Sequence, residues 1–185
     1  DTALVLDRAR AAGLLDAPAG TVLGAFDRLR TEPIDAVRIR VHGDLHLGQI
    51  LATAPEGSPD FDVVFIDFEG EPARPIAARL EKRCPLSDVA GLLRSIDYAG
   101  RQALRLATLA GAVPTDRFDG VDTARAAWTE RLCSAIVDEY LTTIAPAHLV
   151  PADRADAQLL LDLHLLDKCL YEIRYELANR PEWVA

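Results

Sequence analysis

The chain has 185 residues, and its 20 Lys and Arg against 29 Asp and Glu give a formal net charge of −9 at pH 7. This charge would repel a phosphate backbone and an anionic bilayer alike, so nucleic acid and membrane partners are not expected. No apolar run approaches the roughly 20 residues that span a bilayer, and no apolar signal segment follows Asp1, so we expect a cytoplasmic protein. With 50% hydrophobic residues and no low-complexity tract, the composition predicts one globular domain.

The first part of the chain changes its hydrophobic period. Apolar residues recur at three- and four-residue spacing over residues 3–15 and 22–29, which predicts two amphipathic helices. Over residues 37–41 the apolar residues alternate with arginines, which predicts a half-buried strand that ends at His42.

Two more short apolar stretches follow. One begins at Ile50, and the other covers residues 63–66 and predicts a strand that ends at Asp67. The Pro, Glu, Gly and Ser residues between the stretches indicate a turn. We therefore expect a small β element here.

The rest of the chain is predicted to be helical. Ser87 is a plausible N-cap for the first of these helices, and residues 114–122 are predicted to form a loop. Further helices are predicted over residues 124–144 and 153–178. The last of them carries an apolar stripe made of Leu159, Leu160, Leu163, Leu166 and Leu170.

These elements predict a mostly helical α+β fold that forms one lobe over residues 1–185. Trp128 lies on an apolar helix face and is expected in the core. Cys84, Cys133 and Cys169 lie far apart in the sequence, so we expect buried free thiols and neither a zinc site nor a disulfide framework.

The chemically richest segment is the loop after the first predicted strand. It holds His42, Asp44 and Gln49, and the next predicted strand ends at Asp67. Catalytic groups concentrate on loops between rigid elements. Phosphoryl transfer needs one carboxylate to orient the attacking hydroxyl, and a carboxylate with an amide oxygen to hold Mg²⁺ against the phosphates. The two loops could supply this set.

The pattern His42-x-Asp44-x4-Gln49 followed by Ile66-Asp67-Phe68 resembles the catalytic and metal-binding loops of the aminoglycoside phosphotransferase and choline kinase superfamily, which is related to the protein kinases. That pattern usually ends in Asn where this chain has Gln49. The blocks HGDLHLGQ, DFEGEP, RCPLSDVAGLLRSIDYA and DKCLYEIRYELANRPEW, within residues 38–183, are together similar to actinobacterial maltokinases and their glucosamine kinase relatives. Four ordered blocks are more specific than either short motif.

The resemblance implies the C-terminal, catalytic lobe of a protein-kinase-like fold that uses ATP and Mg²⁺. It makes Asp44 the catalytic base, Gln49 and Asp67 the Mg²⁺ ligands, and His42 a residue that braces the catalytic loop. It also implies that the last block faces the sugar. The candidates for substrate binding are His46, Tyr171, Glu172, Tyr175, Glu176, Arg180 and Trp183.

Several of these residues have a structural alternative. Asp44 could form a turn, and His46 could satisfy backbone groups instead of touching substrate. Asp88 could be a charge at a helix N-terminus or an anchor for the catalytic loop. Glu69 and Glu71 could be solvated or could help order the metal or sugar site, and the polar face of the last helix could be a surface ladder of ion pairs.

No GxxxxGK[ST] motif occurs, and no Gly-rich loop followed by a strand lysine precedes Arg38. In kinase-like folds these ATP-clamping parts belong to an N-terminal lobe. An Asp at position 1 and the absence of Met also indicate an excerpt from a longer protein. We therefore expect that this missing lobe of the same protein completes the nucleotide cleft.

The resemblance predicts a sugar kinase that transfers the γ-phosphate of ATP to a sugar hydroxyl. Carboxylates such as Glu172 and Glu176 would suit a protonated amine, and the last block departs from maltokinases at residues 169–170 and 173–174, so glucosamine is placed ahead of maltose. Alternatives are a maltokinase, an aminoglycoside phosphotransferase, a non-catalytic pseudokinase domain and a metal-dependent hydrolase that uses the loop histidines.

Overall fold

The computed structural model describes residues 24, 26–27, 33–53 and 62–179. The helices expected over residues 3–15 and 22–29 fall almost wholly outside these described residues. The chain forms two compact units, one of residues 37–150 and one of residues 1–36 together with 151–185. The expectation of a single lobe stays a prediction.

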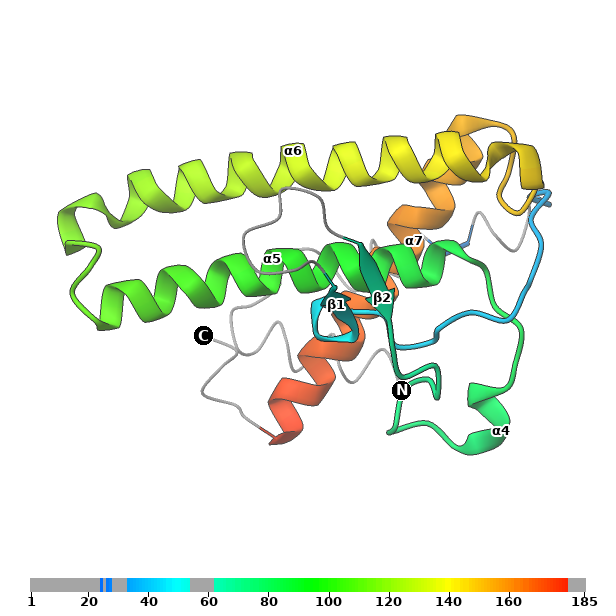
Figure 1. The fold of residues 1–185 in the computed structure, drawn as a ribbon, viewed down its shortest axis with the longest axis horizontal. Helices are drawn as coiled ribbons and strands as arrows, with labels where there is room; N and C mark the ends of the chain where they lie inside the picture. The colour runs from blue at the N-terminus through cyan, green and yellow to red at the C-terminus, as the bar shows by residue number, and fades with distance from the viewer. Residues whose placement is uncertain (1–23, 25, 28–32, 54–61, 180–185) are drawn as a thin grey trace. The chain divides into compact units, whose positions relative to one another are not determined.

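The small sheet lies in the unit of residues 37–150. Strand β1 (Ile50–Ala52) pairs antiparallel with β2 (Val63–Phe65), and the register sets Ile50 opposite Phe65 (Figure 1). Strand β1 lies in the apolar stretch predicted to begin at Ile50, and β2 lies within the strand predicted over residues 63–66. Residues 37–41 do not form the regular strand that their alternation predicts, because only Ile39 pairs, in a single bridge to Arg83. The partner segment cannot lengthen this bridge, since Pro85 enters a helix two residues later.

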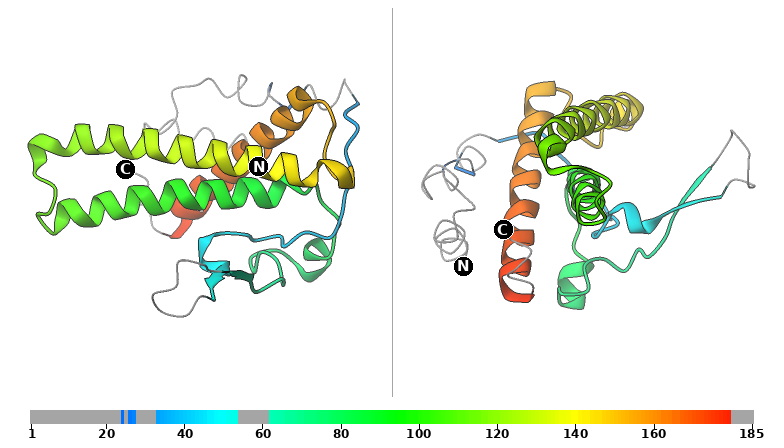
Figure 2. Two further views of the ribbon diagram at one scale, coloured as in Figure 1. Left: turned by 45° about the horizontal axis from the view of Figure 1, so that its top comes forward. Right: turned by 90° about the vertical axis from the view of Figure 1, so that its left-hand side faces the viewer.

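Helices α5 (Leu86–Leu109) and α6 (Phe118–Ile144) make up most of this unit, together with the short helix α4 (Ile76–Arg79). Figures 1 and 2 show α5 and α6 running side by side in opposite directions. One face of α5 is buried at the three- and four-residue spacing of an amphipathic helix. Its buried apolar residues are Leu86, Val89, Ala90, Leu93, Ile96 and Leu104.

Two predicted boundaries are wrong. Pro85, not Ser87, occupies the N-cap position of α5, and the Ser87 hydroxyl has no hydrogen-bond partner among the residues that the structure describes. Most of residues 114–122 are helical, because α6 begins at Phe118. Asp119 in its first turn is favoured there, because a carboxylate offsets the positive end of the helix dipole.

The prediction that Trp128 belongs to the core is also wrong, because this side chain is 52% exposed. Arg125 and Thr129, four residues apart on α6, are the side chains that approach Gly100 of α5. Trp128 lies about 100° around the helix from Thr129 and about 60° from Arg125, at the edge of that contact, where its side chain stays exposed.

The second unit contributes α7 (Arg154–Asn179) to the described residues, close to the predicted 153–178. The carboxylate of Asp153 accepts hydrogen bonds from the backbone N–H of Ala155 and Asp156 and so caps the helix. Leu160, Leu163 and Leu170 of the predicted stripe are buried, whereas Leu159 and Leu166 are half-buried.

The described residues thus form a mostly helical α+β structure with one two-stranded sheet. In this part of the chain no helix is both long and apolar enough to cross a bilayer. Cys84, Cys133 and Cys169 are half-buried thiols, and desolvation raises the pKa of Cys84 and Cys133. These two cysteines are therefore less nucleophilic at neutral pH than an exposed thiol.

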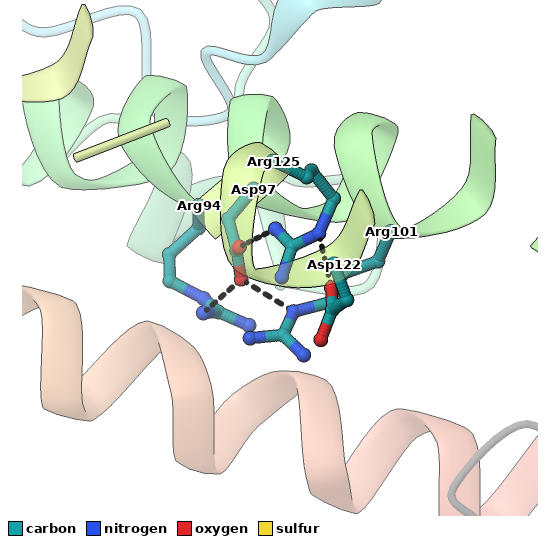
Figure 3. A network of polar contacts seen from close by, with 5 residues as sticks. All are labelled: Arg94, Asp97, Arg101, Asp122 and Arg125. Atoms are coloured by element: carbon teal, nitrogen blue, oxygen red, sulfur yellow. Dashed lines mark hydrogen bonds and ion pairs between the residues drawn. The ribbon is translucent and has the colours of Figure 1, made fainter. Parts of the chain in front are cut away.

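A network of charged groups links α5 to α6 (Figure 3). Arg125 of α6 donates from Nη1 to Asp97 at 3.1 Å and from Nε to Asp122 at 2.7 Å. Asp97 also accepts from Arg101 at 2.9 Å and pairs with Arg94 at 3.4 Å. Partial burial opposes ionisation, but the hydrogen bonds and charges of Arg101, Arg94 and Arg125 outweigh it and hold the pKa of Asp97 below its ordinary value.

We expect Asp97→Asn to lower the stability of the full-length protein, because Arg125 is largely buried and would lose an ionised partner. The expected cost is about 1.5–3 kcal/mol, as for hydrogen bonds to charged groups. The folded-state pKa of Asp97 lies below its unfolded value of about 3.9, so this stabilisation is complete above about pH 4 and is lost as the pH falls through the folded-state pKa. Thermal unfolding of wild type and variant should therefore converge in acid.

The control is Glu130→Gln, which removes a charge from an exposed position of α6. It should leave the unfolding temperature nearly unchanged. A difference between wild type and Asp97→Asn that stays constant down to pH 2 would contradict the role of the ionised carboxylate.

Candidate active site

The sheet register brings Gln49 and Asp67 together. Gln49 ends a short 3-10 helix, η1 (Leu47–Gln49), and is followed directly by β1. Ile66 follows β2 and donates its backbone N–H to the carbonyl of Gln49 at 3.0 Å. The next side chain, Asp67, then accepts a hydrogen bond from Gln49 Nε2 at 3.0 Å. The two residues predicted as metal ligands are therefore neighbours.

The loops that carry Asp44 and Asp67 touch through their backbones. Gly43 and Gly70 have φ angles of +85° and +78°, and a Cβ added to Gly43 would lie 3.2 Å from the Cα of Gly70. Asp67 also has a positive φ of 62°, which is uncommon outside glycine but is tolerated best by Asp and Asn. Asp44 directly follows Gly43 and is half-buried.

His42 is 5% exposed and joins the two loops. Its Nε2 lies 2.7 Å from the carbonyl oxygen of Ile66, and its ring packs against Phe68 with 4.8 Å between centroids. A carbonyl oxygen can only accept, so Nε2 carries the proton. Nδ1 is then free to accept the backbone N–H of Asp44, at 3.4 Å. The two contacts thus assign the donor role to Nε2 and the acceptor role to Nδ1.

The first turns of α5 support the His42 loop. Asp88 accepts the backbone N–H of His42 at 2.7 Å with one carboxylate oxygen, and that of Gly43 at 2.9 Å with the other. Ser95, seven residues further along α5, accepts the N–H of Leu47 at 3.1 Å. Asp88 and Ser95 therefore hold the backbone of this loop against α5.

Between these two anchors, Gly91 allows a close approach, because a Cβ added there would lie 2.6 Å from the carbonyl oxygen of Leu45. Sequence reasoning missed Gly91 and Ser95. Their spacing of three and seven residues from Asp88 places all three on one face of α5, and this spacing was the signal that could have found them.

The remaining candidates near the loops have local contacts. His46 accepts the N–H of Gly48 at 3.1 Å through Nδ1 and so caps η1; contact with a substrate stays a prediction. Glu69 is exposed, and Glu71 accepts the N–H of Ala73 at 3.4 Å.

In the other unit, α7 carries the predicted sugar-binding residues. The rings of Tyr171 and Tyr175 stack with 6.5 Å between centroids. Lys168 Nζ and Arg174 Cζ lie 5.2 Å and 5.4 Å from the Tyr171 centroid. Glu172 and Glu176 are half-buried, and Arg180 and Trp183 lie outside the described residues.

The donor set at Gln49 and Asp67 fits Mg²⁺ rather than a transition metal. Their hydrogen bond uses the amide nitrogen and one carboxylate oxygen, so the amide oxygen and the other carboxylate oxygen stay available as ligands. Mg²⁺ is commonly held by one or two protein carboxylates, with substrate phosphates and water completing its shell. No group of three or more His, Cys, Asp and Glu side chains could hold a metal within the described part of the chain.

The chain is similar in sequence to known glucosamine kinases, although no protein-family model matches it. It is 32% identical over 169 residues to the glucosamine kinase of Streptacidiphilus jiangxiensis, with 88% of this chain and 32% of that protein covered. It is 30% identical over 180 residues to the glucosamine kinase of Mycolicibacterium smegmatis, with 89% and 39% covered. The chain spans well under half the length of both relatives.

Solved glucosamine kinases are similar in fold. One structure, in complex with glucosamine, ADP and inorganic phosphate, gives a TM-score of 0.67 at 25% identity and covers 99% of this chain and 43% of that chain. A second, crystal form B, gives a TM-score of 0.68 at 25% identity and covers 99% and 41%. The chain therefore resembles glucosamine kinases in both sequence and fold, over part of their length.

We expect Asp88→Asn to loosen the loop that carries Asp44. Asparagine keeps the size of the side chain but offers one acceptor oxygen, so one of two backbone N–H groups loses its partner, at a cost of about 1–3 kcal/mol. Hydrogen exchange of the full-length protein should show faster exchange at His42 and Gly43. The exposed Asp116→Asn, in the 3-10 turn before α6, is the matched control. Unchanged exchange at both amides would contradict the anchoring role.

Proposed function

We propose that this chain is the C-terminal, catalytic lobe of an ATP-dependent sugar kinase with a protein-kinase-like fold, and that its acceptor is an amino sugar, glucosamine. The observation that carries the proposal is the hydrogen bond of Gln49 to Asp67 beside the loop of Asp44. It gathers the carboxylate and amide oxygens that phosphoryl transfer requires. The similarity to glucosamine kinases supports the choice of acceptor.

In this proposal the acceptor hydroxyl attacks the γ-phosphorus of ATP, the bond to the ADP oxygen breaks, and the hydroxyl proton passes to Asp44. Gln49 and Asp67 would hold Mg²⁺, which neutralises charge on the phosphates when it is bound. Asp88 accepts the N–H of His42 and Gly43, and His42 Nδ1 accepts the N–H of Asp44, so these two side chains hold the backbone that carries the Asp44 carboxylate.

The parts that clamp ATP are proposed to lie outside these 185 residues, in an N-terminal lobe of the same protein. The length of the relatives supports this, because the chain covers 32% and 39% of the two glucosamine kinases. The sugar is proposed to meet α7, where two half-buried carboxylates and a stacked pair of tyrosines offer hydroxyl acceptors and an apolar face. Arg180 and Trp183 belong to the same proposal.

A metal-dependent hydrolase is less well supported. It would need His42 as a ligand, and His42 Nε2 already donates to the carbonyl oxygen of Ile66.

The kinase alternatives differ in the acceptor that receives the phosphate. The experiment that separates them measures ADP release by the full-length protein with glucosamine, maltose, glucose and aminoglycosides. Release with none of them would favour a pseudokinase domain.

For the catalytic base, we expect Asp44→Asn to lower kcat by roughly 10²–10⁴-fold, because proton transfer and orientation of the hydroxyl are both lost. The thermal unfolding temperature should change little, and Asp116→Asn should retain wild-type turnover. Turnover of Asp44→Asn within a few-fold of wild type would contradict the assignment.

For the amine, we expect Glu172→Gln or Glu176→Gln, whichever residue faces the amino group, to penalise glucosamine more than glucose. The change removes charge and keeps shape, so the difference between the two sugars should reach about 1.5–3 kcal/mol, as for a charge-assisted hydrogen bond. The measurement is kcat/KM for each sugar, with the KM of ATP and the exposed Glu130→Gln as controls. Equal losses for both sugars would contradict recognition of the amine.

A further inference from the structure

The segment that follows Asp67 has little regular structure of its own. Between β2 and the four-residue α4, residues 66–75 form neither helix nor strand, so their carbonyl groups need other hydrogen-bond donors. In a segment of this kind, the position of the backbone depends on the side chains that supply those donors.

Arg79, the last residue of α4, supplies two of them. Its Nε donates to the carbonyl oxygen of Arg74 at 2.8 Å, and its Nη2 donates to that of Pro72 at 2.8 Å. The planar guanidinium presents donors in a fixed fork, so these two contacts fix the direction of the side chain.

The aliphatic part of Arg79 also packs on the glycine that joins the two loops. A Cβ added to Gly70 would lie 3.4 Å from the Cβ and 3.7 Å from the Cγ of Arg79. Gly70 also approaches Gly43, where an added Cβ would be 3.2 Å from the Gly70 Cα. The buried Gly70 therefore lies close both to the Arg79 stem and to the catalytic loop.

A second arginine fixes the same segment from the chain that leads into the catalytic loop. Arg40 donates from Nη2 to the carbonyl oxygen of Phe68 at 3.2 Å, and from Nη1 to that of Arg79 at 3.3 Å. Phe68 is the residue directly after Asp67. The two arginines thus bind the segment on both sides of Gly70.

We propose that Arg79, assisted by Arg40, is a positioning residue that holds the Asp67 segment against the Asp44 loop and so sets the geometry of the proposed metal and phosphate site. This inference rests on the proposed phosphoryl transfer. In the proposal neither arginine contacts the substrate, and each acts through the backbone of the segment that carries Asp67.

The test compares Arg79→Met, Arg79→Lys and wild type in the full-length protein. Methionine keeps much of the stem and removes every donor, whereas lysine keeps the charge and cannot reproduce the fork. Arg131→Met, at an exposed position of α6, is the matched control. The first measurement is hydrogen exchange without nucleotide or metal. In Arg79→Met we expect faster exchange at the N–H of Ile66, which donates to Gln49, and of Arg74, which donates to Glu71, with exchange in α5 unchanged.

The second measurement is ADP release with glucosamine. We expect Arg79→Met to lose roughly 10–100-fold in kcat or in apparent Mg²⁺ affinity, as is typical for groups that orient metal ligands, with the KM of glucosamine unchanged. Arg79→Lys should recover part of the loss. Adding Arg40→Met to Arg79→Met should lower kcat or the apparent Mg²⁺ affinity by a smaller factor than Arg40→Met does in the wild type. The reason is that the two arginines hold the same segment.

Unchanged exchange at Ile66 and Arg74 would overturn the proposal, whatever the activity. Faster exchange with unchanged kcat and Mg²⁺ dependence, in a protein whose wild type is active, would also overturn it and leave Arg79 a purely structural role. If Arg79→Met does not fold, the same two comparisons are made with Arg79→Lys. An inactive wild type would count against the proposed function, and the exchange measurement would still test the contact.

Discussion

The site depends first on one carboxylate that accepts two backbone N–H groups. The loop at His42 and Gly43 has no strand or helix to satisfy its donors, and Asp88 supplies one oxygen to each, at 2.7 Å and 2.9 Å. Asp88 stands in the first turn of α5, which is buried along one face and tied to α6 by the Asp97 network. The position of the Asp44 loop is therefore set by the helical core.

The site depends, second, on the register of a very short sheet. Three residue pairs join β1 and β2, and the pairing of Ile50 with Phe65 is what brings Gln49 opposite Ile66 and next to Asp67. A slip of one residue would reverse the faces of the strand and separate the two side chains. Because a sheet of this size fixes its own register weakly, contacts outside the ladder, such as that of His42 with Ile66, help to hold it.

The sequence was informative wherever the hydrophobic period or a strand end determined the outcome. The two strands, α7 and the pairing of Gln49 with Asp67 could all be predicted on that basis. The pattern could not show that residues 37–41 lack a partner beyond Arg83, or which side of α6 meets Gly100, and so the assigned strand and the placement of Trp128 were wrong. Arg79 could not be found either, because its partners are backbone carbonyls, which every residue type carries equally.

The two loops need opposite kinds of hydrogen-bond partner. The loop of Asp44 presents N–H groups, and the acceptors Asp88 and Ser95 on α5 satisfy them. The segment of Asp67 presents carbonyl groups, and arginines satisfy these. His42 takes part in both arrangements, since its backbone donates to Asp88 and its ring donates to the Ile66 carbonyl. A histidine suits this position because its ring offers a donor at Nε2 and an acceptor at Nδ1, which accepts the N–H of Asp44.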